Sequence, residues 1–310
     1  TGYDQMGTHN YENSSMQTGT NGTSYYFSVA SGDITNFFNE VDLNTPWDYH
    51  YENLDSRTIL DRLAAVKYFV VKAGEEEYLP YGYDTLAAEV EKNDKLYRAY
   101  ECKNALPIGY TYDSYIPEEK YAKMSTVEKQ QALLQGVILS NSTVPETTSE
   151  FNDREVPYKL VTGSGCREKD GKLIVTKENA QAKLVFDGLD ECETYLITEG
   201  VDYEALSPRE LISDKKWSKM TLYEQKKIQY ENSTWRYWKE SQKAYIDVTG
   251  QFLDKTISVF TDKYNAYSGR SDFLCNTGYS VKGKKSITLT FENTGCLLYT
   301  SDAADEARSV

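Results

Sequence analysis

The second half of the chain contains a series of short runs in which apolar and polar residues alternate, and no other feature restricts the fold as strongly. Alternation with a period of two places one face of a strand in a core and the other in water. Turn residues such as Asp170-Gly171 and Lys282-Gly283-Lys284 separate the runs. The runs are KLIVTKE, AKLVFDG, ETYLITEGVDY, AYIDVTG, TISVFTDK and KSITLTFEN. Many short strands of this kind are typical of an antiparallel β-sandwich, which we predict over residues 158–295.

A helical insertion is predicted to interrupt this sandwich at about residues 207–243. Ser207 and Glu210 have the spacing of a capping box, in which two side chains bond reciprocally to backbone amides at a helix N-terminus. Thr221 and Glu224 repeat that spacing in TLYEQKKI. We therefore expect two helices inside the insertion.

The first half of the chain mixes helical and strand patterns. SRTILDRLAAV, at 56–66, carries apolar residues at helical spacing, with Asp55 or Ser56 as its N-cap, and leads directly into the strand-like run VKYFVV. A helix that runs into a strand indicates a layered α/β region, which we place at 37–145. Residues 1–36 are rich in Asn, Gly, Ser and Thr and are expected to form an extended N-terminal segment.

The two halves are separated by a polar stretch with two prolines, residues 140–157. We place a linker at 146–157, because domain boundaries fall in polar, proline-containing segments. The predicted fold class is therefore α+β. An N-terminal mixed α/β region is followed by an antiparallel β-sandwich with a helical insertion.

Charge and apolar content argue against several classes of function. The net charge of −14 disfavours nucleic acid and anionic lipid surfaces as partners, because both attract Lys and Arg. No run of about 18 apolar residues is present, so nothing in the sequence is predicted to span a bilayer. The 27 tyrosines outnumber the 10 phenylalanines and 4 tryptophans. This excess fits either the wet aromatic surface of a sugar-contacting protein or a β-rich fold that uses tyrosine as a strand former.

The cysteines and histidines do not form a recognisable metal site. The five cysteines are spread singly, without a CxxC pair, and the two histidines are too few and too far apart for zinc. Single cysteines of this kind are expected to be small buried apolar residues. The cysteines are Cys102, Cys166, Cys192, Cys275 and Cys296.

No catalytic motif is present, and the candidate binding residues are aromatic or acidic. Trp235, Tyr237 and Trp238 form the densest aromatic group. These rings could stack on a sugar, or dock the insertion on the sandwich, and the i, i+3 spacing of the two tryptophans favours docking. Asp113, in YTYDSY, is flanked by aromatic residues and is either a glycan contact or a solvated turn carboxylate.

An ordered series of motifs over roughly residues 20–295 resembles one family. The series includes GTNGTSYYFSVASGDITNFF, LDSRTILDRLAAVKYFVV, NALPIGYTYDSYI, VEKQQALLQGVIL and CETYLITEGVDY. Together these motifs resemble the YfhO family of bacterial multi-pass membrane proteins, which is similar to membrane glycosyltransferases of the GT-C architecture.

The resemblance implies a role outside the cytoplasmic membrane. This chain would be the extracytoplasmic domain of a protein that transfers sugar from a polyprenyl-phosphate donor to a cell-wall polymer such as lipoteichoic acid. Its partners would be its own missing transmembrane helices and a cell-wall glycan or lipid-linked sugar. The catalytic acidic residue of such enzymes lies on a loop between membrane helices and has no counterpart here, and no cofactor is expected. The alternatives are a non-catalytic glycan-binding module and an outer scaffold domain.

The last residues read as translated library DNA. CLLYTSDAADE, from Cys296 to Glu306, matches the translation of a transposase mosaic-end adapter and its usual continuation. We therefore expect residues 296–310 to be adapter read-through and exclude them from the predicted fold. The sandwich would then be truncated at its C-terminal end. An unpaired strand near 285–292, or a fortuitous strand partner from the tail, is expected.

Overall fold

The structure is a computed structural model in which strand (41%) is about twice as abundant as helix (20%). It describes residues 2–5, 13, 15–16, 19–27, 29, 31–43, 50–51, 53–151, 153–203, 207–234, 243–250, 254–262, 264, 267, 269–279, 282–292, 298–301 and 307–309. The mixed fold class, with several antiparallel sheets, is confirmed.

The N-terminal region is built on a five-stranded sheet. In spatial order its strands are β2 (Asn21–Gly22), β1 (Gly2–Gln5), β5 (Val66–Lys72), β7 (Lys95–Cys102) and β6 (Tyr83–Lys92). β6 and β7 form a hairpin, and its two loop residues, Asn93 and Asp94, both have positive φ. Such two-residue loops match the twist of paired strands, and Asn and Asp tolerate the left-handed conformation that they need. The predicted strand VKYFVV is β5.

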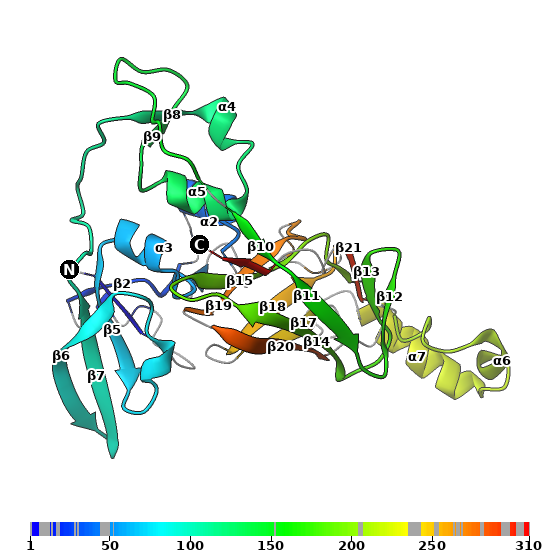
Figure 1. The fold of residues 1–310 in the computed structure, drawn as a ribbon. Helices are drawn as coiled ribbons and strands as arrows, with labels where there is room; N and C mark the ends of the chain where they lie inside the picture. The colour runs from blue at the N-terminus through cyan, green and yellow to red at the C-terminus, as the bar shows by residue number, and fades with distance from the viewer. Residues whose placement is uncertain are drawn as a thin grey trace.

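Three helices lie near the junction of this sheet and the sandwich (Figure 1). They are α2 (Gly32–Glu40), α3 (Thr58–Leu63) and α5 (Thr126–Ala132). α5 begins with the full reciprocal capping box of Ser125 and Glu128. α3 begins differently from the prediction, because Arg57 occupies its N-cap position and makes no side-chain cap. Asp55 and Ser56 have positive φ and form the preceding turn instead.

Smaller elements complete the N-terminal region. The 3₁₀-helix η1 (Glu76–Tyr78) follows β5, and α4 (Glu118–Tyr121) precedes α5. β3 (Tyr25–Tyr26) pairs with β4 (His50–Tyr51), and β8 (Tyr115–Pro117) pairs in parallel with β9 (Val137–Leu139).

The second half folds as the predicted antiparallel sandwich. One sheet has the order β11 (Tyr158–Thr162), β14 (Ala180–Gly188), β20 (Gly283–Glu292), β17 (Lys243–Thr249) and β18 (Asp254–Phe260). The facing strands form two further sheets. Their orders are β10 (Arg154–Val156), β22 (Ala307–Ser309), β15 (Glu193–Thr198), β19 (Phe273–Tyr279), and β12 (Cys166–Lys169), β13 (Lys172–Val175), β21 (Leu298–Ser301), β16 (Asp202–Tyr203).

Strict alternation along the strands produces the sandwich core. Ala244, Ile246 and Val248 on β17 are buried, whereas their neighbours along the strand are half-buried or exposed. They join one apolar cluster with residues of the facing strands, such as Leu196 and Phe273. The period of two in the sequence therefore predicts which face of β17 is buried.

The expectation of an unpaired strand near 285–292 is wrong. β20 covers these residues and is hydrogen-bonded on both sides, to β14 and to β17. It lies in the middle of its sheet, whose edges are β11 and β18. The C-terminal residues do pair with the sandwich, but elsewhere: β21 lies between β13 and β16, and β22 lies between β10 and β15.

The helical insertion projects from one end of the sandwich (Figure 1) and contains α6 (Asp214–Trp217) and α7 (Leu222–Thr234). Thr221 and Glu224 bond reciprocally at the start of α7, as the spacing predicts. Ser207 and Glu210 also bond reciprocally, but residues 208–212 form turns rather than a helix. The two reciprocal bonds between side chains and backbone amides thus form here without a helix.

A buried polar cluster joins the N-terminal region to the sandwich. The Arg57 guanidinium is fully buried and donates to the carbonyl of Leu274 on β19 at 2.7 Å. Asp55 accepts from the backbone amide of Asn276 at 2.7 Å and pairs with Lys255 of β18. The two halves therefore share charged hydrogen bonds inside one core, although a linker at 146–157 is predicted between them.

A second buried acid lies beside this cluster. Glu193 on β15 accepts from the backbone amide and hydroxyl of Thr58, the first residue of α3, and from the hydroxyl of Tyr195. Burial raises the pKa of the Glu193 carboxyl, although these hydrogen bonds oppose the shift. Glu193 thereby ties the start of α3 to the sandwich.

The described cysteines are unpaired. Cys102, Cys166 and Cys275 are buried and Cys192 is half-buried. Cys296 lies outside the described residues. Over the part of the chain that the structure describes, no helix combines the length and apolarity needed to cross a membrane.

Candidate functional site

Three cavities open around helices α2, α3 and α5. The largest has a volume of about 910 Å³ and lies against α2, α3 and the loop that contains Tyr110 and Tyr112. A second, of about 420 Å³, lies between α3 and the C-terminal end of α5. A third, of about 380 Å³, lies between α2 and α5. The helical layer of the N-terminal region therefore offers binding space.

The largest cavity, called the apolar cleft here, is lined almost entirely by apolar and aromatic side chains. Asp33 is the one charged residue among its described lining residues. The aromatic lining consists of Tyr25, Phe27, Phe37, Phe38, Tyr110 and Tyr112. The aliphatic lining consists of Val29, Ile34, Leu54, Leu60, Leu63, Ala64 and Leu133. This composition is typical of sites for apolar ligands with a few polar contacts.

The aromatic rings of the apolar cleft are arranged in pairs. Tyr25 stacks on Phe27 with 5.5 Å between ring centroids, and Tyr110 meets Tyr112 edge to face at 5.4 Å. The Tyr112 hydroxyl donates to the carbonyl of Leu133. Burial, with a smaller contribution from Tyr110, raises the pKa of Tyr112 well above its usual value. Tyr112 therefore remains a neutral donor at physiological pH and fixes the 110–112 loop against α5.

The cleft has a buried floor and an open apolar rim. Leu54 and Leu60 are 5% and 1% exposed and form part of the N-terminal core. Val29 and Ile34 at the rim are 90% and 44% exposed. A contiguous patch of exposed apolar side chains is typical of an interaction surface.

Helix α2 separates apolar from polar binding space. Ile34, Phe37 and Phe38 line the apolar cleft. Asn36, Asn39 and Glu40 line the 380 Å³ cavity. Residues three and four apart share one face of a helix. The spacing of apolar and polar residues along α2 therefore determines which face lines each cavity.

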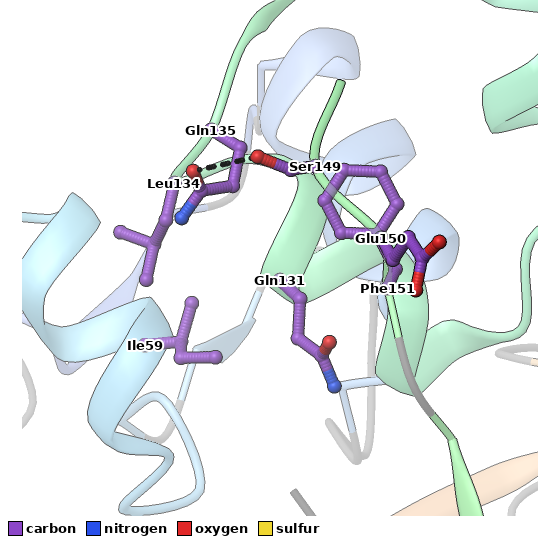
Figure 2. A pocket seen from close by; sticks show the side chains of 7 residues that line it. All are labelled: Ile59, Gln131, Leu134, Gln135, Ser149, Glu150 and Phe151. Carbon is purple, nitrogen blue, oxygen red and sulfur yellow. Dashed lines mark hydrogen bonds between the residues drawn. The ribbon is translucent and has the colours of Figure 1, made fainter. Parts of the chain in front are cut away.

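The cavity between α3 and α5 has a mixed lining, and Figure 2 shows its side chains. Ile59 comes from α3 and Leu134 from the turn after α5, and Phe151 lies on the opposite side of the cavity. The Ser149 hydroxyl donates to the side-chain oxygen of Gln135 at 3.2 Å. This bond occupies the side-chain oxygen of Gln135.

The structure describes one of the four predicted site residues, Asp113. Asp113 is exposed in the loop after Tyr112 and is not among the residues that line the apolar cleft. Trp235, Tyr237 and Trp238 lie outside the described residues. Among the described residues no group of His, Cys, Asp and Glu could hold a metal ion.

Sequence reasoning missed the cleft because it treated residues 1–36 as an extended segment. Residues 32–36 belong to α2, and Ile34, Phe37 and Phe38 have helical spacing that could have revealed an apolar face. The partners of that face come from residues 22–31 and 110–112, which carry no periodic signal. Only the tertiary fold brings those segments to α2.

A comparison with known families now becomes informative. The family model described as "Bacterial membrane protein YfhO" matches residues 5–291, nearly the whole chain and all of α2, α3, α5 and the sandwich up to β20. The chain belongs to the YfhO family. The resemblance drawn from the ordered motifs is thereby confirmed. The match ends before Cys296, where the predicted adapter-derived segment begins, and the origin of that segment stays a prediction.

One curated relative belongs to the same family. The uncharacterized protein YfhO of Bacillus subtilis (strain 168) is 26% identical over 164 residues. The aligned part covers 52% of this chain and 18% of the relative. This YfhO-family chain therefore spans less than a fifth of the length of the curated relative that it matches.

Proposed function

We propose that this YfhO-family chain is the extracytoplasmic domain of a membrane glycosyltransferase that transfers sugar from a polyprenyl-phosphate donor to a cell-wall polymer such as lipoteichoic acid. The apolar cleft carries the proposal. A protein of a bacterial membrane family with an open apolar cleft of about 910 Å³ suits a ligand that has one end in lipid. An isoprenoid chain is such a ligand.

The proposed role of the cleft is to hold part of the isoprenoid chain of the donor. Burying one CH₂ group is worth about 0.8 kcal/mol, so a few isoprene units on the aromatic walls would suffice to localise the carrier. Rim residues such as Val29 and Ile34 are already exposed, so the apolar chain would enter without disrupting the core. The methyl-bearing double bonds of an isoprenoid pack well against the paired rings of Tyr25 and Phe27.

In this proposal the domain positions the substrate and does not carry out bond cleavage. Asp33 is the one acid among the described lining residues of the cleft, and the other titratable groups there are the tyrosines Tyr25, Tyr110 and Tyr112. General acid–base chemistry requires a group within hydrogen-bond reach of the reacting proton. Holding the carrier raises the local concentration of sugar near the part of the protein that does the chemistry.

A second candidate function is a cell-wall glycan-binding module, with a purely structural outer scaffold as a further alternative. The paired tyrosines Tyr110 and Tyr112 favour glycan binding, because a tyrosine ring offers an apolar face for a sugar and a hydroxyl for hydrogen bonding. The aliphatic side of the cleft, including Ile34 and Leu63, favours a lipid chain over a glycan.

The test uses the full-length protein in a bacterium whose lipoteichoic acid can be isolated. Ile34→Asp and Val29→Asp each place a charge at the rim of the cleft. We expect the ratio of polymer-bound sugar to glycerol phosphate to fall about tenfold, the factor that corresponds to 1.4 kcal/mol of lost apolar contact.

The matched control is Leu222→Asp at the start of α7, where the leucine is 69% exposed and far from the cleft in the chain. It should leave the sugar content unchanged. If both cleft variants are present at normal amounts in the membrane and the sugar content is normal, the proposed role of the cleft is wrong. Absence of any sugar loss when the whole gene is deleted would reject the glycosyltransferase proposal itself.

A further inference from the structure

The 380 Å³ cavity between α2 and α5, called the polar pocket here, has a lining unlike that of the apolar cleft. Every described lining residue carries a polar or charged side chain. The residues are Asn36, Asn39, Glu40, Asp42, Thr126 and Lys129. Its volume lies within the range of small-molecule sites, near the lower end.

The charges of the polar pocket exclude simple ions. Lys129 forms an ion pair with Glu40, and its ammonium group lies 5.6 Å from the centre of the Tyr121 ring. No group of His, Cys, Asp and Glu among the residues that the structure describes could hold a metal ion. The carboxylates of Glu40 and Asp42 in turn repel phosphate and other anions.

The amides and the acid offer hydrogen bonds to a neutral ligand. Asn39 accepts from Arg270 at 2.7 Å through its carbonyl oxygen, which leaves the NH₂ group as a donor. Asp42 accepts from the hydroxyl of Thr126 through one oxygen. Over the described part of the chain, no second donor to the Asp42 carboxyl is recorded, so its other oxygen can accept from a ligand.

Asp42 is held firmly at the floor of the polar pocket. Its backbone has a positive φ of 45°, and its carbonyl accepts from the buried guanidinium of Arg57 at 3.0 Å. Burial raises the pKa of the Asp42 carboxyl, while the bond from Thr126 and the charge of Arg57 oppose that shift. A carboxyl placed in this way is oriented before any ligand arrives, which lowers the cost of binding.

We propose that the polar pocket binds a neutral monosaccharide unit, a hexose or an N-acetylhexosamine. Sugar hydroxyls both donate and accept hydrogen bonds, which matches a lining with amide donors and carboxylate acceptors. The inference rests on the proposed function for its biological meaning, since it names where that function would hold sugar. Helix α2 would then present lipid-binding and sugar-binding space on opposite faces, which suits one amphipathic substrate.

The experiment measures binding of free glucose, galactose and N-acetylglucosamine to this chain by saturation-transfer NMR, with titration to obtain dissociation constants. We expect at least one of the three sugars to receive saturation. Asn36→Ala and Asp42→Asn should each weaken it about tenfold, because one hydrogen bond to an oriented polar or charged group is lost. Asparagine tolerates the positive φ of residue 42, so Asp42→Asn keeps the backbone.

Asn104→Ala is the matched control, because Asn104 is an exposed turn asparagine after β7. It should bind sugar as the unchanged chain does. No saturation of any sugar, or equal binding by Asn36→Ala and Asp42→Asn, would overturn the proposal. Tighter binding of glucosamine than of N-acetylglucosamine would also overturn it, because the pocket would then be a site for amines. Sugar transfer is not measured here, so failure of this site and failure of the proposed function can be told apart.

Discussion

At the residue scale, the buried side chains of Arg57 and Glu193 join the N-terminal region to the sandwich. Arg57 is fully buried and donates to Asp55 and to carbonyl groups of Val41 and Leu274. Removing one partner of a buried network leaves the other groups buried without a hydrogen-bond partner. The resulting loss of stability is larger than the stability that the intact network adds relative to an apolar core. The identity of Arg57 is therefore fixed by partners that lie far away in the sequence.

Replacing Arg57 by Leu should lower the free energy of unfolding by about 3–5 kcal/mol, because Asp55 and the Leu274 carbonyl lose a buried donor. Urea titration followed by far-UV circular dichroism measures the change. The control is Arg98→Leu on β7, where the half-buried arginine pairs with Glu76 and Glu89 at the surface and should cost about 1 kcal/mol or less. Equal losses in the two variants would contradict the assigned role of Arg57.

Glu193 should make stability depend on pH. Its native pKa is raised by burial, so the native state binds more protons than the unfolded state above the ordinary Glu pKa of about 4.3. The contribution of Glu193 is therefore most favourable below that pKa and is lost as pH rises through the raised native pKa. Glu193→Gln should remove this loss, so urea midpoints at pH 5 and pH 8 should differ less in the variant. A pH dependence that is unchanged by the substitution would show that Glu193 stays ionised when folded.

At the element scale, short sequence patterns predict the buried face of β17 and the start of α5. The alternation in AYIDVTG gives the buried face of β17 correctly, and the Ser125–Glu128 spacing gives the start of α5. The same patterns do not predict which strands pair with one another. β20 was expected near an open edge, but it is central because β14 and β17 approach it from distant parts of the chain. Pairing between such strands depends on packing of the whole sandwich and has no local signature.

Deleting residues 296–310 should leave the sheet that contains β20 intact. That sheet draws no strand from the tail, because β21 and β22 pair with strands of the other two sheets. Hydrogen exchange measured on the chain that ends at Gly295 should show the amide of Leu289, in the middle of β20, protected as in the whole chain. Loss of that protection would show that the tail stabilises the sheet that contains β20. That result would contradict both the observed pairing of β21 and β22 with the other two sheets and the predicted adapter origin of the segment.

At the scale of the whole molecule, the polar cluster around Arg57 makes the two predicted regions depend on each other. The sequence indicates the polar stretch at 140–157 as a boundary. It carries no signal for the contacts that α3 makes with β15, or that the turn before α3 makes with β19. Those contacts join Thr58 to Glu193 and Asp55 to Asn276. Single residues more than a hundred positions apart have no shared period, so sequence patterns could not predict that the regions share a core.

The isolated sandwich, residues 158–295, should unfold at a lower urea concentration than the chain 1–295. Without the N-terminal region, Glu193 loses the donors of Thr58, and the amide of Asn276 loses Asp55. Urea titration of both fragments tests this dependence, with tryptophan fluorescence as a second probe of the transition. An equal midpoint for the two fragments would show that the polar cluster adds nothing to the sandwich and that 146–157 is a true boundary between independent domains.

The candidate site also belongs to the scale of the whole molecule, and its central claim is that the apolar cleft holds an isoprenoid chain. The most direct test is isothermal titration of this chain with farnesyl phosphate, a short soluble isoprenyl phosphate. Saturable binding is predicted. It should be weakened about tenfold by Ile34→Asp, which places a charge against the apolar lining, and unchanged by Leu222→Asp at an exposed site on α7. Absence of saturable binding, or equal binding by Ile34→Asp and the unchanged chain, would contradict the claim.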